Sequence, residues 1–251
     1  MALAPSTPDL AGLRARIDAI DDQIADLLVA RLAIVRQVGQ IKGDRAAGRL
    51  ALRLGREAQM LRRLLERTAG GFPAVGTLRI WREIIAISTQ IEVPFGCLVD
   101  GTGGVLLHDL ARDQVGSATP IETVADAFAA LERLRSGGPW LAVLAPPEPS
   151  AWWPAALPDA VRVVGRLPLT GTGRPRGWVA ARLEPEPSGA DRTLLLADHL
   201  LPGAMLLASV PGSQLVEIDG FPDPSALPPG CRLLGAYPAP LPLPNLPDEP
   251  S

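Results

Sequence analysis

Apolar side chains recur at alternating steps of four and three residues across the first 42 positions of the chain. The series is Leu13, Ile17, Ile20, Ile24, Leu27, Ile34, Val38 and Ile41, and the charged Arg31 occupies one further position of the same spacing. This spacing is typical of a helix that packs along its whole length. Thr7, Pro8 and Asp9 supply an N-cap, a proline for the first helical position and an acid for the first turn. The pattern predicts a helix from about residue 9 to about Lys42, roughly 50 Å long at about 1.5 Å per residue.

Two shorter helices are predicted before residue 94. After an expected loop at 43–51, a second stripe ends at the glycine pair 70–71. Its positions are Leu54, Glu57, Leu61, Leu64 and Thr68. Pro73 opens a third helix and Pro94 stops it. The stripe of that helix is Leu78, Trp81, Ile85, Ser88 and Glu92.

Polar side chains occupy stripe positions where apolar ones are expected, namely Arg31, Glu57, Ser88 and Glu92. A buried charge costs several kcal/mol unless it is paired or binds a ligand. Lys42, the single lysine, lies about 20° from Arg31 and about 16 Å further along the same helix face. These residues either form internal ion pairs and set the register of a helical dimer, or they line a site for a small dianion. Arg and Lys bind carboxylates through charge-assisted hydrogen bonds, and the pattern alone leaves both interpretations open.

The length of the first helix indicates a second chain. About 90 residues folded alone cannot cover a helix of roughly 50 Å, so a homodimer is expected. Arg14 lies about 100° round the helix from Arg31, where it can face the partner. Arg56 adjoins Glu57 and adds to a cationic pocket with one or two carboxylates between the helices.

The composition changes after residue 93. Residues 1–93 carry a net charge of +4 and three prolines, whereas residues 94–251 carry −7 and 24 prolines. Short apolar runs surround a helical stretch at 121–134, which predicts a mixed β/α fold. The proline-rich end at 241–251 is predicted to be an extended, disordered tail.

Several classes of protein are excluded by the composition. No run of about 18 apolar residues occurs, and the first residues lack the pattern of a secretory signal, so we expect a cytoplasmic protein without a membrane span. The two cysteines and two histidines show no metal-ligand spacing, and no metal is expected. An isoelectric point near 5.5 argues against nucleic-acid binding.

The ordered segments LRARIDAIDDQIADLLVAR, GREAQMLRRL and IWREIIAISTQIE, with a lysine that ends the first helix, resemble the all-helical (AroQ-type) chorismate mutases. The resemblance covers residues of about 10–93. It implies an intertwined dimer of three-helix chains in aromatic amino acid biosynthesis, including phenylalanine biosynthesis. Such proteins convert chorismate to prephenate by an intramolecular [3,3] rearrangement without a cofactor.

The resemblance also implies a role for each matched residue. Arg31 and Arg56 look like the holders of the substrate carboxylates, and Arg14 like the arginine that reaches into the partner's site. Lys42 resembles the donor to the ether oxygen, and Glu57 resembles the acid that holds the substrate hydroxyl.

The remaining matched positions lie on the third helix and in the first loop. Ser88 resembles a polar contact, and Glu92 stands where many members carry glutamine as the second ligand of the ether oxygen. An ionised carboxylate would repel the developing oxyanion, so Glu92 is expected to act when neutral. The loop before Arg56 looks about two residues longer than in compact members and places Arg53 where they carry an aspartate that contacts substrate.

The second half is similar to prephenate dehydratases in a shortened form. VDGTGGVLLHDLARDQ resembles their first lobe, and the residues after GRPRGWVAARL resemble the passage into a regulatory ACT domain. Pro175 stands where the dehydratase motif has threonine, and proline has no hydroxyl, so dehydratase activity is doubtful. The expected domains are a helical mutase domain at 1–93, a degenerate α/β region at 94–184, an ACT-like α+β segment at 185–240 and the tail.

These expectations favour a chorismate mutase, an isomerase, with a non-catalytic or regulatory second half. An isochorismate pyruvate-lyase shares the same helical site and differs in the position of the substrate hydroxyl. A bifunctional mutase and dehydratase is a further alternative. A non-catalytic dimeric module that senses a metabolite is an alternative outside the enzymes.

Overall fold

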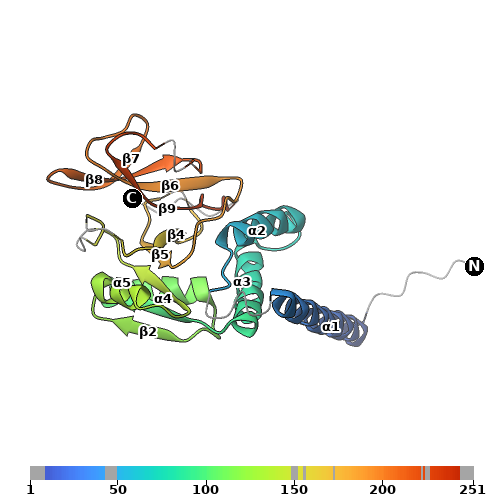
Figure 1. Ribbon diagram of the computed structural model, residues 1–251. Coiled ribbons are helices and arrows are strands. Elements are labelled where there is room, and N and C mark those ends of the chain that lie inside the picture. Colours follow the sequence, from blue (N-terminus) through green and yellow to red (C-terminus); the bar gives the residue numbers. More distant parts are fainter. Residues whose placement is uncertain are drawn as a thin grey trace, which may run out of the picture. The chain divides into compact units, whose positions relative to one another are not determined.

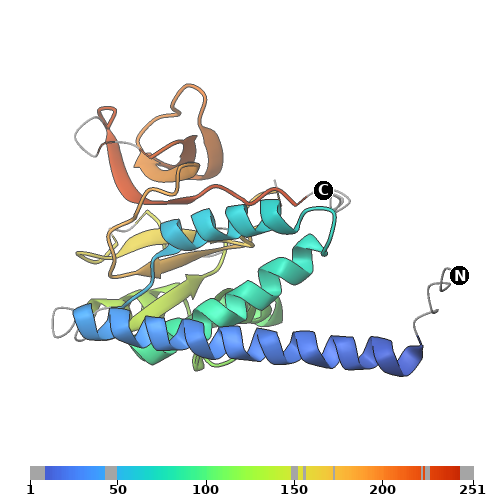
Figure 2. The same cartoon turned by 90° about the vertical axis from the view of Figure 1, so that its right-hand side faces the viewer.

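The computed structural model of the chain describes residues 9–42, 50–147, 152–154, 157–171, 173–221, 223 and 227–243. By its contacts the chain divides into two compact units, Met1–Arg45 and Ala46–Ser251. Within the described residues the first unit is one helix, α1 (Leu10–Lys42), which Figures 1 and 2 show as a single uninterrupted rod. The long first helix predicted by the sequence is therefore confirmed.

The apolar side chains of the α1 stripe are exposed within the part of the chain that the structure describes. Ile17 is 57% exposed, Ile24 51% and Leu27 68%. A single helix can bury an apolar face only against another element, and a face left in water contributes no hydrophobic stabilisation. The described residues of this unit therefore give α1 no hydrophobic stabilisation along this face.

Two helices, α2 (Leu54–Thr68) and α3 (Ala74–Glu92), begin the second unit and confirm the other helices that the sequence predicted. Gly70 takes a φ of +77°, a conformation that glycine adopts without a steric penalty, and it lets the chain turn between them. Leu61 and Leu78 pack together with Leu241 from the far end of the chain. The hydroxyls of Thr68 in α2 and Thr77 in α3 lie 3.0 Å apart and form a hydrogen bond between the two helices.

The strands of the second unit form one sheet of nine strands in the order β2-β1-β3-β5-β4-β9-β6-β8-β7 (Figure 1). Strand β1 is parallel to β2 and β3, and β4 is parallel to β9. The other neighbouring strands are antiparallel. Helix α4 connects β1 to β2, and helix α5 connects β2 to β3. The bounds are β1 Gly96–Asp100, η2 Gly101–Gly103, α4 Gly104–Val115, β2 Ile121–Val124, α5 Ala127–Arg135, β3 Trp140–Leu144, β4 Arg162–Leu167, β5 Gly177–Ala181, β6 Asp191–Ala197, β7 Met205–Val210, β8 Ser213–Asp219 and β9 Cys231–Pro238. The predicted mixed α/β region is confirmed.

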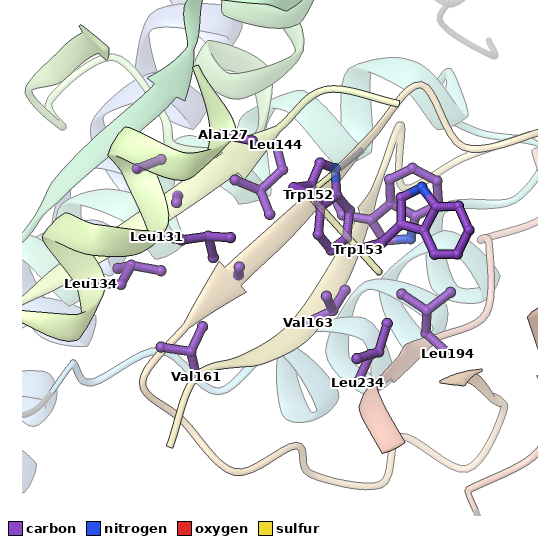
Figure 3. Packing of buried hydrophobic residues seen from close by; sticks show 14 of the residues in the cluster. Ala127, Leu131, Leu134, Leu144, Trp152, Trp153, Val161, Val163, Leu194 and Leu234 are labelled. Atoms are coloured by element: carbon purple, nitrogen blue, oxygen red, sulfur yellow. The ribbon is translucent and has the colours of Figure 1, made fainter. Parts of the chain in front are cut away.

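Helices α4 and α5 cover opposite faces of the sheet. Cys97 and Val99 of β1 pack in one apolar cluster with α4, whereas Leu98 packs in another with α5, because successive side chains of a strand point to opposite faces. Figure 3 shows the second cluster, in which Trp152 and Trp153 gather with α5 and strand residues. Both indoles are almost wholly buried. This tryptophan pair is therefore core and does not line an open pocket.

Residues 185–240 contain four strands, β6 to β9, and their described parts contain no helix between these strands. The ACT-like segment is accordingly not confirmed. At the start of the expected tail, Leu241 is fully buried and forms a β-bridge with Thr170. The prediction of a disordered tail is wrong at this residue, because an apolar gap beside α2 and α3 takes up its side chain. Residues 244–251 lie outside the described residues.

Candidate active site

The residues that the sequence singles out are divided between the two units. Arg14, Arg31 and Lys42 lie on α1, and Lys42 is its last residue. Because α1 is continuous, these three residues keep the spacing along the helix that the sequence pattern predicted. The other predicted residues lie on α2, on α3 and just before α2, in the second unit.

The first turn of α2 carries Arg56 and Glu57. The Arg56 side chain is exposed, whereas Glu57 is partly buried and lines a small cavity with Arg82, Ile85 and Thr89 of α3. Desolvation raises the pKa of Glu57, and the Arg82 guanidinium opposes this rise. Burial thus favours the neutral form of this carboxyl group, and the nearby Arg82 favours its charged form.

Arg82 is a residue that the sequence reasoning missed. Its Nη1 donates to the Gln114 side-chain oxygen at 2.8 Å and to the Asp113 carbonyl at 3.2 Å, while its buried Nη2 has no hydrogen-bond partner within the described residues. Burial lowers the pKa of Arg82, and Glu57 and then Asp113 raise it. Its place four residues after Leu78 and three before Ile85 was the signal, because that spacing puts it on the inner face of α3.

Ser88 and Glu92 lie in the last two turns of α3. The Ser88 hydroxyl is buried and donates to the Ile84 carbonyl at 2.6 Å, one turn earlier in the helix. Glu92 is partly exposed at the end of the helix. Both residues thus lie where the third-helix pattern placed them.

Arg53 contacts the second half of the chain. Its Nε donates to both carboxylate oxygens of Glu186, at 3.0 and 3.2 Å, in a pair whose two side chains are roughly half exposed. An exposed pair of this kind stabilises weakly, by about 0–1 kcal/mol, but it fixes a direction for the side chain. This contact gives a physical reason for an arginine at a position where the resemblance leads one to expect an aspartate.

The glycine-rich turn after β1 is held by its own chain. Asp100 is fully buried and accepts hydrogen bonds from the backbone N–H and hydroxyl of Thr102 and from the backbone N–H of Ala145. Gly104 has a φ of +62°, which explains a glycine at the start of α4. These hydrogen bonds and the positive φ of Gly104 account for the glycine-rich turn.

In the described part of the chain, no group of three or more His, Cys, Asp or Glu side chains comes together in a way that could hold a metal ion. None of the described helices combines the length and apolar character needed to cross a membrane.

The comparisons with known proteins agree with the helical resemblance. Residues 13–93 match the model of the family "Chorismate mutase type II", which confirms the family of the helical segment. A curated relative from Aquifex aeolicus (strain VF5), a bifunctional chorismate mutase/prephenate dehydratase, is 29% identical over 136 residues. The match covers 51% of this chain and 37% of the length of that relative. No solved structure matches the chain.

Proposed function

We propose that this protein converts chorismate to prephenate in aromatic amino acid biosynthesis. The family match over residues 13–93 carries the proposal, because it contains every catalytic and substrate-holding residue inferred above. Incubation of the purified chain with chorismate is expected to consume it and to yield prephenate. Incubation with isochorismate tests the lyase alternative, since release of pyruvate would mark that reaction instead.

The chemistry follows from where charge develops. As the carbon–oxygen bond breaks, negative charge grows on the ether oxygen, and we infer that the Lys42 ammonium stabilises it more in the transition state than in the ground state. Arg31 and Arg56 hold the two carboxylates and keep the flexible substrate in its compact reactive shape. Glu57 holds the hydroxyl, and Arg14 acts from a partner chain. The reaction is intramolecular and needs no nucleophile, metal or cofactor.

Arg53 has a different place in this proposal. Its side chain holds Glu186, so we infer that it contributes to the attachment of α2 and leaves the substrate to Arg56 and Glu57. Ser88 adds a polar contact from α3.

A homodimer through α1 is part of the proposal. The apolar side chains of the α1 stripe are exposed among the described residues, and a second copy brings a matching stripe. Ile24→Glu is expected to weaken the dimer and to lower activity at the same protein concentration, because it places a charge in an apolar seam. Sedimentation would measure the dissociation. Ala19→Glu, on the other side of α1, is the matched control and should remain dimeric. A monomeric wild type that is fully active would contradict the proposal.

Glu92 is the proposed second ligand of the ether oxygen. A carboxylate repels the negative charge that develops there, whereas an amide donates to it, so Glu92→Gln should keep or raise kcat/KM for chorismate. A large loss of kcat/KM in this variant would show that Glu92 does not act in this way.

A bifunctional mutase and dehydratase is the second candidate, since the relative bears both activities in its name and its 136 matched residues extend past the helical segment. Pro175 counts against it, because its ring offers no hydroxyl at a position where the dehydratase resemblance requires one. Release of phenylpyruvate from prephenate would decide. The regulatory ACT-like role of residues 185–240 stays a prediction, as does the division of the chain into domains at 93 and 184.

A further inference from the structure

A short segment before β6 contacts one face of α2. Arg62 Nη1 donates to the Ser188 carbonyl at 2.7 Å, and its Nη2 donates to the Ala190 carbonyl at 2.9 Å and to the Ser188 hydroxyl at 3.2 Å. One guanidinium thus joins a residue of α2 to two residues that lie more than 120 positions later in the chain. We call residues 186–190 the clamp segment.

The clamp segment is itself fixed. The Ser188 backbone N–H donates to both carboxylate oxygens of Asp191, at 3.0 and 2.9 Å, and its hydroxyl donates to the Ala190 carbonyl at 2.8 Å. Ser188 is 2% exposed and Asp191 8%. Asp191 is the first residue of β6, an interior strand of the sheet, so Arg62 bonds to a rigid part of the second half.

Helix α2 approaches the clamp segment closely. A Cβ placed on Gly55 would lie 2.5 Å from the Glu186 carbonyl oxygen, so only glycine allows the two backbones to approach this far. Gln59 also lies near, with its Nε2 3.4 Å from the Pro187 carbonyl. Gly55, Gln59 and Arg62 fall within about 60° of one another on α2 and define one clamped face.

The proposed substrate-holding residues lie on other faces of the same helix. Glu57 is about 140° round α2 from Arg62, and Arg56 about 120°. A turn of the helix by about 10° would move a side-chain tip at a radius of about 6 Å by about 1 Å. A displacement of that size can cost about 10²-fold in rate when it misplaces groups that position a substrate.

We propose that the clamp segment sets the rotation of α2, with Arg62 as a positioning residue that places Arg56 and Glu57 for substrate. The inference rests on the proposed mutase function and extends it. The second half then acts as part of the scaffold of the active site, in addition to any regulatory role. Arg62 makes no contact with substrate and acts only through α2.

The test compares full-length Arg62→Met with wild type. We expect kcat/KM for chorismate to fall about ten- to 100-fold, with a higher KM, because the carboxylate and hydroxyl holders are displaced. Amide hydrogen exchange in residues 54–68 should become faster. Arg62→Lys, which keeps a donor but loses the two-pronged bond, should fall between the two. Arg63→Met is the matched control: Arg63 is the next residue, it is exposed, and its variant should match wild type.

The outcomes separate the two proposals. If wild type does not convert chorismate, the proposed function fails and this inference fails with it. If wild type is active and folded Arg62→Met keeps its kcat/KM, only the positioning role is overturned. An apparent kcat that falls at an unchanged KM, in proportion to the loss of folded protein, would also overturn it, because that result reports stability alone.

Discussion

Lys42→Ala is expected to lower kcat/KM for chorismate by about 10² or more. A donor fixed in advance near an oxygen that gains negative charge contributes about 2.7–4 kcal/mol to the transition state. Water in its place must reorganise as the charge develops, so it replaces little of this stabilisation. Because Lys42 acts mainly on the transition state, most of the loss should appear in kcat.

The matched control for this change is Arg36→Ala. Arg36 is also a cation on α1. It is exposed, precedes Lys42 by six residues and lies on the side of the helix away from the apolar stripe. Its removal should change kcat/KM by less than about twofold. Steady-state rates with chorismate would measure both variants. Equal and small effects of the two changes would favour the non-catalytic sensing module over the mutase.

Arg82→Met is expected to destabilise the second unit by about 2–3 kcal/mol. The change leaves the Glu57 carboxylate in its cavity without the guanidinium that opposes its desolvation. Removing one partner of a buried ion pair costs about 3–5 kcal/mol, and the figure here is smaller because Arg82 and Glu57 share a cavity without a direct ion pair and both are partly exposed. The midpoint of thermal unfolding should fall by roughly 5–10 °C.

The destabilisation by Arg82→Met should grow with pH. Burial already raises the pKa of Glu57, and loss of Arg82 raises it further above the value in the unfolded chain. Stability is then lost as pH rises through the folded-state pKa, whereas at about pH 4 the carboxyl is largely neutral in both states. Unfolding by denaturant at about pH 4 and pH 7 measures the difference. Adding Glu57→Gln should remove it; an equal loss of stability at both pH values would contradict this account.

Most of the helical segment could be predicted from sequence because its signals are local. The 4-3 spacing from Leu13 to Ile41, the stop at residues 70–71 and the prolines at 73 and 94 need no knowledge of distant residues. The mixed α/β character of the second half was also readable from its short apolar runs. The pairing of β9 with β4 and β6 was not, because strand order depends on residues far apart in the chain.

The candidate site divides in the same way. Arg31, Glu57, Ser88 and Glu92 stood out because a polar residue interrupts an apolar stripe, which is a pattern along one helix. Arg62 carried no comparable signal and Arg82 only its spacing on α3, since their partners come from the clamp segment and from the last turn of α4. The packing of Leu241 was hidden for the same reason, because its proline-rich surroundings indicate an exposed chain.

By itself the sequence determined the three helices, the residues along their stripes and the family of the helical segment, because helix periodicity and capping act over a few residues. Only the tertiary structure decided that α2 and α3 pack as one body with the strands, that Arg53 pairs with Glu186, and that Arg82 faces Glu57. These contacts join residues brought together by folding, and their energies depend on burial and on the charges beside them, which no local pattern records.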